Sequence, residues 1–553
     1  MRMNVSLLVL PIILTGLLFV SCGKSAKSSS KTKGPLPQTS VSGPILNISL
    51  DTEIDSLDQQ KAVYSSSFEL IADCIDGLMQ MAADGSVKNA IAEKETISPD
   101  GLVYTFNLRQ DAYWSNGDPV TAHDFVYGWQ RAADPATQSE YAFMMSDIAQ
   151  IKNASAILTG QMEPNQLGVR AIDDYTLQVE LKVPVSYFDQ LLYFCTFYPA
   201  NQKFIEQCGE NYGTSPETYL SNGAFLLTDY KKGAKTISLI KNTAYYDASK
   251  VKLGGLHYQV VGAEEGLSLY NSGKIDLLEL ENAQVPALKN SSEFLAVDSG
   301  FLYYVSTNLH KKELNNQNMR LALSLAIDRE DIEQVLGNGS KPAYQCIPSG
   351  FAFNSRGEDF NKGKNEFKSV CDYNPSLASE YYKKACRELG KNTFSFEILC
   401  NDHADQIAVA ESIKGTVEGV LQGVHIKIRT VPKSERRKTM ARGDYELGIT
   451  NWGPDYADPM TYLSMWMTGN DNNTGDYSNP KYDAIIASCQ DGELCTKLEE
   501  RWTALKQAES IIMDEAVVFP LYQQCKADMI KSGIKGIEFH PVAINRVYKS
   551  VTK

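Results

Sequence analysis

The stretch that most constrains the fold is residues 104–133, where a strand, a tight turn and a capped helix follow one another. Three apolar residues alternate with polar ones and share one face of the strand: Tyr104, Phe106 and Leu108. Asn116-Gly117 supplies a turn, and Thr121 is placed to cap a helix that runs to about Ala133. The inward face of that helix consists of Phe125, Val126 and Trp129. These aromatic residues therefore serve a hydrophobic core.

Further along the chain, strand and helix patterns alternate and predict a mixed α/β architecture. Strands are expected at 236–240, 256–261, 394–399, 424–428 and 516–523, and helices at 318–336 (in two pieces), 405–421 and 496–514. Asp328 is placed to cap the second piece of 318–336. The order strand, helix, strand within 394–428 is typical of a parallel-sheet unit.

Residues 1–22 have the pattern of an export signal. An apolar run follows Arg2, is too short to span a bilayer, and ends at Ser21-Cys22, which suits cleavage and lipid attachment to the thiol. The segment resembles a bacterial lipoprotein signal; the alternative is a plain secretory peptide in which Cys22 is incidental. Residues 23–44 are rich in Ser, Lys, Gly and Pro and are expected to form a flexible tether. We therefore expect an exported, periplasmic protein that is lipid-anchored to a bacterial membrane.

Composition narrows the possible partners. With 553 residues, 43% hydrophobic and 22% charged, the chain should form a soluble body of two or three domains. The net charge of −14 is spread along the sequence and argues against a nucleic-acid partner. After Cys22 ten cysteines remain, and export makes disulfides plausible, with Cys371/Cys386 and Cys489/Cys495 close enough in sequence to pair.

Catalytic and metal-binding motifs are missing from the sequence. It contains no GxSxG, HExxH, Walker A or strand-linked GxGxxG pattern, and Cys400 with His403 lacks a second ligand pair for zinc. We therefore expect no catalytic residues, no metal and no cofactor, and a protein that is not an enzyme.

One loop does suggest binding chemistry. In "NWGPDYADP" (451–459), prolines and a glycine fix an irregular backbone around Trp452, Asp455 and Tyr456. A partly desolvated aspartate beside an indole suits an ammonium group, through a charge-assisted hydrogen bond and cation–π attraction. The alternative is a proline-rich turn whose aspartate caps backbone amides.

Several segments, in order, resemble the oligopeptide-binding proteins, the extracytoplasmic solute-binding subunits (family 5) of peptide ABC importers. They are 98–141, 221–247, 269–276, 315–332 and 451–459, and the resemblance extends from about residue 45 to the end. It implies an α/β, three-domain periplasmic-binding-protein fold with mixed sheets, whose two lobes close on the ligand. The implied division is domain I at 45–76, 204–300 and 521–553, domain II at 77–203, and domain III at 301–520.

The resemblance also implies ligand-binding residues. Asp455 matches the aspartate that holds a peptide's α-amino group, Trp452 and Gly453 match its flanking contacts, and Tyr141 and Tyr304 match pocket tyrosines. Other ligand-facing positions depart from the family pattern: Val63, Tyr64 and Ser65 replace a Glu-Gly-Val run, Glu279 and Leu280 replace Tyr-Asn, and Ile449 replaces an arginine for which Arg442 is a possible substitute. How a ligand carboxylate is held therefore stays open.

Together these observations predict a non-catalytic, monomeric lipoprotein that captures oligopeptides and delivers them to an ABC permease and its ATPase. The sequence leaves open a binder of modified (murein) peptides or of another, non-peptide solute. A secreted hydrolase or surface adhesin is the alternative of a different class, and either would need a nucleophile–base pair or an exposed contact patch.

Overall fold

The computed structural model describes residues 33–37, 42–50, 52–82, 85–354, 356–361 and 367–553. The predicted signal peptide, Cys22 and most of the predicted tether lie outside these residues. Residues 34–553 form one compact unit.

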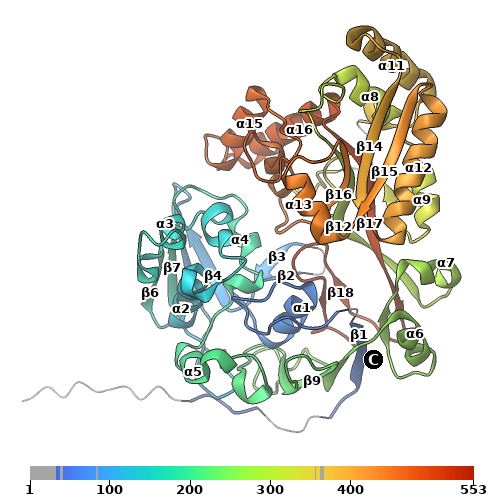
Figure 1. Cartoon of the computed structure of the whole chain (residues 1–553). Coiled ribbons are helices and arrows are strands. Elements are labelled where there is room, and N and C mark those ends of the chain that lie inside the picture. The colour runs from blue at the N-terminus through green and yellow to red at the C-terminus, as the bar shows by residue number, and fades with distance from the viewer. Residues whose placement is uncertain (1–32, 38–41, 51, 83–84, 355, 362–366) are drawn as a thin grey trace, which may run out of the picture. The chain divides into compact units, whose positions relative to one another are not determined.

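A mixed sheet of eleven strands runs through this unit (Figure 1). Its strands are β1 (Ile45–Leu50), β8 (Phe225–Asp229), β9 (Thr236–Lys241), β10 (Gly255–Val260), β11 (Leu277–Glu279), β12 (Phe294–Thr307), β13 (Lys341–Pro342), β14 (Phe394–Asn401), β15 (Val424–Val431), β16 (Leu447–Trp452) and β17 (Val518–Ile530). The order is β15-β14-β16-β12-β17-β11-β1-β10-β9-β8, with β13 also paired to β17. The two longest strands, β12 and β17, lie side by side and antiparallel, and they join the two ends of the sheet.

Three smaller sheets complete the strand inventory of the described residues. An antiparallel sheet has the order β4-β5-β7-β6, with β4 at Ala92–Ile97, β5 at Val103–Leu108, β6 at Val169–Asp173 and β7 at Thr176–Glu180. Two hairpins pair β2 (Met79–Met81) with β3 (Val87–Asn89), and β18 (Glu538–Phe539) with β19 (Arg546–Val547).

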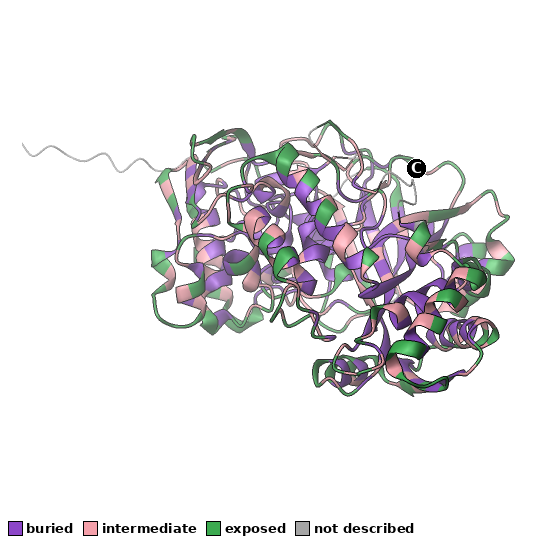
Figure 2. Cartoon of the chain, turned by 90° about the horizontal axis from the view of Figure 1, so that it is seen from above, coloured by how far each residue is buried: buried purple, intermediate pink, exposed green. Residues whose placement is uncertain are grey.

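The helices cover the sheets and place their apolar sides inward, so that buried residues line the interior in Figure 2. They are α1 (Ser65–Cys74), α2 (Ala122–Ala133), α3 (Ala154–Leu158), α4 (Phe188–Leu191), α5 (Gln202–Cys208), α6 (Ala263–Asn271), α7 (Val285–Leu288), α8 (Gln317–Leu325), α9 (Arg329–Leu336), α10 (Lys368–Cys371), α11 (Pro375–Leu389), α12 (Ala404–Val420), α13 (Lys433–Ala441), α14 (Met460–Leu463), α15 (Pro480–Gln490) and α16 (Leu498–Asp514). None of the helices in the described part of the chain combines the length and apolarity that crossing a bilayer requires.

The strand, turn and capped helix predicted at 104–133 are confirmed. The backbone N–H of Thr121 donates to the Asp124 carboxylate at 2.7 Å, which closes a capping box at the start of α2. Phe125 and Trp129 are fully buried, whereas Val126 is only half-buried. Gly117 turns the chain with φ +83°.

The predicted parallel unit is also confirmed, since β14 and β15 pair in parallel and α12 connects them. Asp328 caps α9 by accepting from two backbone amides. The last predicted strand is longer than expected: β17 continues to Ile530, because β11 and β12 supply hydrogen-bonding partners on both of its edges. The mixed α/β class is therefore confirmed, whereas the residue bounds of the three domains stay a prediction.

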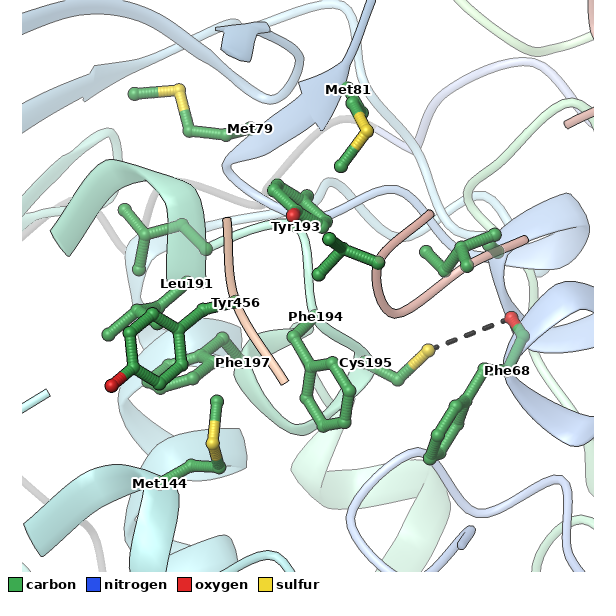
Figure 3. Packing of buried hydrophobic residues seen from close by; sticks show 14 of the residues in the cluster. Phe68, Met79, Met81, Met144, Leu191, Tyr193, Phe194, Cys195, Phe197 and Tyr456 are labelled. Carbon is green, nitrogen blue, oxygen red and sulfur yellow. Dashed lines mark hydrogen bonds between the residues drawn. The ribbon is translucent and has the colours of Figure 1, made fainter. Parts of the chain in front are cut away.

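The expectation of disulfides is wrong. None of the ten described cysteines after Cys22 forms a disulfide, and this includes Cys371, Cys386, Cys489 and Cys495. Nine of them are buried and act as small apolar side chains in the core, as Cys195 does in Figure 3. Burial raises the pKa of the Cys400 thiol to about 11, so that it is protonated and unreactive at neutral pH.

Thiol accessibility tests this arrangement. In protein that lacks residues 1–22, we expect one thiol, the half-buried Cys208, to react rapidly with a thiol reagent in the native state. All ten should react after denaturation without reductant. Cys208→Ser should remove the rapid phase, and a count below ten in denatured protein would show that a disulfide is present after all.

Candidate functional site

The loop that follows β16 takes a path set by two close backbone approaches. A Cβ on Gly453 would lie 2.4 Å from the ring of Phe301, and a Cβ on Gly300 would lie 2.5 Å from the ring of Pro454. A larger residue at Gly453 would have to displace the Phe301 ring, and one at Gly300 would also lie 2.7 Å from the Pro541 carbonyl oxygen. The sequence prediction that Gly453 and Pro454 fix this loop is consistent with these contacts.

Two buried side chains anchor the loop on either side of its centre. Tyr456 stacks on Tyr187 with ring centroids 4.7 Å apart, and Figure 3 shows it in the same buried cluster as Leu191 and Phe197. Asp458 accepts two hydrogen bonds from Arg501, at 2.7 and 2.8 Å, and both side chains are buried. The loop is thereby tied to α16 and to the segment around α4.

Asp455 lies between these anchors and is left without a partner. Among the described residues, no group donates a hydrogen bond to its carboxylate and no cation pairs with it; only its backbone N–H is engaged, by Thr461 Oγ1 at 3.4 Å. Burial raises the pKa of Asp455 to about 6. A carboxylate that is partly desolvated and unpaired is electrostatically unsatisfied, and a cation supplied from outside the protein would stabilise it.

Trp452 and Tyr141 lie beside this carboxylate. The indole Nε1 of Trp452 donates to the same Thr461 Oγ1, at 3.5 Å. The Tyr141 ring packs against Phe68 and Phe194, with centroids 5.6 and 4.9 Å away. Burial raises the pKa of the Tyr141 hydroxyl, and the nearby Asp455 charge adds to that rise. The structure thus brings Asp455, Trp452, Gly453 and Tyr141 together.

Tyr304 lies deeper than the other predicted residues. The backbone of Tyr304 pairs with that of Thr450, so these two side chains are on the same face of the sheet. Trp452, two residues after Thr450 in the same strand, shares that face with Tyr304. Tyr304 packs edge-on against Trp466 at 6.1 Å and is only 6% exposed. Tyr304 therefore lies in the core next to the site. A contact between Tyr304 and a ligand stays a prediction.

An arginine that the sequence analysis did not single out lies beneath this region. Arg436 of α13 is buried, donates to the Ile449 carbonyl at 2.8 Å, and leaves its Nε without a partner among the described residues. Arg442, the suggested substitute, is instead largely exposed and bound to Glu435 at 3.1 Å. Arg436 stands in a polar, Lys- and Arg-rich helix, so its sequence gives no sign that it is buried.

A cavity of about 320 Å³ lies at the start of α1. It is lined by Leu50, Thr52, Val63, Tyr64, Ser65, Ser66, Glu69, Glu279, Lys526 and Arg546. Four of these, Val63, Tyr64, Ser65 and Glu279, are among the positions at which the sequence departs from the family pattern. The fold therefore brings together, around one cavity, positions that depart from the family pattern and lie more than 200 residues apart in the chain.

This arrangement is suited to binding. The unpaired carboxylate can accept an ammonium group, and the half-buried Trp452 and Tyr141 lie beside it. No cluster of three or more His, Cys, Asp or Glu side chains that could hold a metal is found in the described ranges.

Comparisons with known proteins agree with one another. The bacterial extracellular solute-binding proteins, family 5 (middle region), match residues 86–474. A dipeptide-binding protein of Lactococcus lactis is 30% identical over 557 residues, which is 98% of this chain and 97% of the relative.

Two solved structures show the fold. Listeria monocytogenes OppA bound to peptide is 35% identical, covers 92% of this chain and 99% of its own, and superposes with a TM-score of 0.72. The unliganded open form of the periplasmic murein tripeptide-binding protein MppA is 27% identical, covers 94% and 98%, and reaches a TM-score of 0.79.

The lack of a partner for the Asp455 carboxylate should affect the free energy of unfolding. Because the pKa of Asp455 in the folded protein, about 6, exceeds its ordinary value of 3.8, ionisation destabilises the ligand-free fold as pH rises through this window. Asp455→Asn should therefore raise the free energy of unfolding by roughly 1–3 kcal/mol above pH 6, and the gain should disappear below about pH 4.

Denaturant unfolding at several pH values measures this effect. The exposed Asp471, in the same chain segment, offers the matched control, since Asp471→Asn should leave stability unchanged at every pH. Equal stability of the Asp455→Asn variant and the wild type at pH 7.5 would contradict the proposed desolvation.

Proposed function

The chain belongs to the bacterial extracellular solute-binding proteins of family 5, and we propose that it captures oligopeptides by their free α-amino group for delivery to an ABC permease and its ATPase. The family resemblance and the periplasmic-binding-protein fold predicted from the sequence are confirmed by the match over residues 86–474 and by the solved structures. Capture of a peptide amine by this particular chain is the step that we add. We expect the protein to act as a monomer.

The observation that carries the proposal is the Asp455 carboxylate, which is half-buried and has no partner in the described part of the chain, and whose pKa is raised to about 6 by desolvation. A free α-amino group offers three donors and a positive charge, so it satisfies the carboxylate and regains hydrogen bonds lost on leaving water. Trp452 and Tyr141 enclose that position. Every unmodified peptide carries this group, so recognition through it tolerates many sequences.

Two alternatives differ in the ligand or in the chemistry. The resemblance in fold to a murein tripeptide-binding protein keeps modified peptides as a second candidate. A secreted hydrolase would consume peptide, whereas a binding protein returns it unchanged after denaturation.

Calorimetric titration with a pentapeptide and its N-acetylated form tests amine capture. The wild type should bind the free peptide and bind the acetylated one poorly, because acetylation removes the charge. Asp455→Asn should weaken binding of the free peptide by roughly 2–5 kcal/mol, because the buried ammonium loses its counter-ion. It should hardly affect the weak binding of the acetylated form.

Asp471→Asn is again the control and should bind both peptides as the wild type does. Asp458 is unsuitable for this purpose, since its loss would leave Arg501 buried and unpaired and would disturb the whole loop. Equal affinity of the wild type for free and acetylated peptides would reject amine capture and favour a non-peptide solute.

We also propose that Cys22 carries a lipid that holds the protein at the membrane. Its support is the short apolar run that ends at Ser21-Cys22 in the sequence. Cys22→Ser should release the protein into the soluble fraction after cell lysis. Fractionation followed by intact-mass analysis checks this, and membrane retention of the variant together with an unacylated wild type would contradict it.

A further inference from the structure

The cavity at the start of α1 is built from five segments of the chain. The loop before α1 is held by Asp55, whose carboxylate accepts the backbone N–H groups of Val63 and Tyr64 at 2.9 and 3.2 Å. This leaves the Tyr64 side chain at the mouth, 52% exposed. The opposite walls come from the end of β1 and from β11, β17 and β19. At about 320 Å³ the cavity is far larger than the roughly 30 Å³ that one water occupies in the liquid.

Acidic groups outnumber basic ones in and around the cavity. Arg546 is paired with two carboxylates, since its Nη2 donates to Glu279 at 2.7 Å and to Asp528 at 2.8 Å. Lys526 Nζ lies 3.3 Å from Glu279. The two cations thus neutralise two carboxylates, and Glu69 is the third carboxylate of the group.

Glu69 has no counter-ion of its own. It is 4% exposed, and its Oε2 has no hydrogen-bond partner among the residues that the structure describes. The Oδ2 of Asp528 lacks a partner as well. Burial raises the pKa of Glu69 to about 7, and the positive charges of Arg546 and Lys526 only partly oppose that rise. An acceptor oxygen buried in the wall of a cavity needs a donor, and the surplus of carboxylates selects a positively charged one.

We propose that this cavity is a subsite for a basic side chain of the captured peptide, an ammonium or a guanidinium group, with Glu69 as its counter-ion. The aliphatic part of such a side chain would pass Tyr64, while its charged end would reach Glu69 and Glu279. A ligand carboxylate fits less well, because both cations of the cavity are already paired. The inference rests on the proposed function, since it names the kind of peptide that binds best.

The position of the cavity agrees with a peptide held by its amino group at Asp455. Pro454 meets Gly300 of β12, and nearer the start of the same strand Val297 pairs with Lys526 and Leu295 with Asp528. These strand residues span about 10–17 Å from Gly300. An extended peptide covers that length in about three to five residues. Phe68 and Glu69 are also consecutive in α1, the first touching Tyr141 and the second lining the cavity.

A lysine scan tests the subsite. The probes are alanine hexapeptides with a free amino group, each carrying one lysine at positions 3, 4, 5 or 6, and the same peptides with norleucine in its place. By calorimetric titration, at least one lysine position should bind the wild type about tenfold more tightly than its norleucine counterpart. Glutamate at that position should bind no better than norleucine.

Two variants assign the preference to the cavity. Glu69→Gln keeps the shape of the side chain and should reduce the lysine preference to less than about twofold, with norleucine binding unchanged. Tyr64→Lys places a cation at the mouth on an exposed residue and should also lower the preference, because the new ammonium competes for the cavity. The half-buried Glu95, in the separate four-stranded sheet, provides the control: Glu95→Gln should keep the full preference.

The outcomes distinguish the subsite from amine capture. Binding of all peptides without a lysine preference, or a preference that survives Glu69→Gln, would overturn the subsite while leaving amine capture intact. If no hexapeptide binds, both the proposed function and the subsite are rejected. A preference for glutamate would show that the cavity recognises an anion and would also overturn the proposal.

Discussion

The antiparallel pairing of β12 with β17 is the contact on which the rest of the structure depends. These strands run together from Phe294 opposite Met529 to Ser306 opposite Val518, and they connect the β14–β16 end of the sheet to the β1–β10 end. One end of the pair supports β16 and the Asp455 loop, and the other carries Lys526 and Asp528. The amine site and the charged cavity are therefore linked through one strand pair, whose register shifts between Asp298 and Leu302.

Much of the local structure could be predicted, because it depends on signals within a few residues. The capping box of α2, the Asp328 cap of α9 and the β14-α12-β15 unit each follow from side chains next to the backbone that they satisfy. The Asp455 site was predicted for another reason, since a short, proline-rich loop carries both its carboxylate and its indole. Bringing Tyr141 beside that loop required the resemblance to a family.

Other features depend on residues far apart in sequence and were missed or predicted wrongly. Spacing alone suggested that Cys489 and Cys495 would pair, but both are buried as free thiols. Glu69 and Arg436 stand in helices where a charged residue normally faces solvent, and only the packing of distant strands buries them. The polar residues after Gln523 concealed the second half of β17, which exists because strands on both sides pair with it.

The hydrogen bonds of β1 have a consequence for how the body assembles. This strand pairs with β10 and β11, and the Ile45 carbonyl accepts from Lys553 at 2.8 Å across 508 residues of chain. Lys549 likewise pairs with the buried Asp76. Contacts of such long range form late, because the intervening chain must first be ordered. The β1 strand and Asp76 therefore gain these partners only once the C-terminal residues are available, so the N-terminal part of the body cannot complete its contacts while the rest of the chain is still being made.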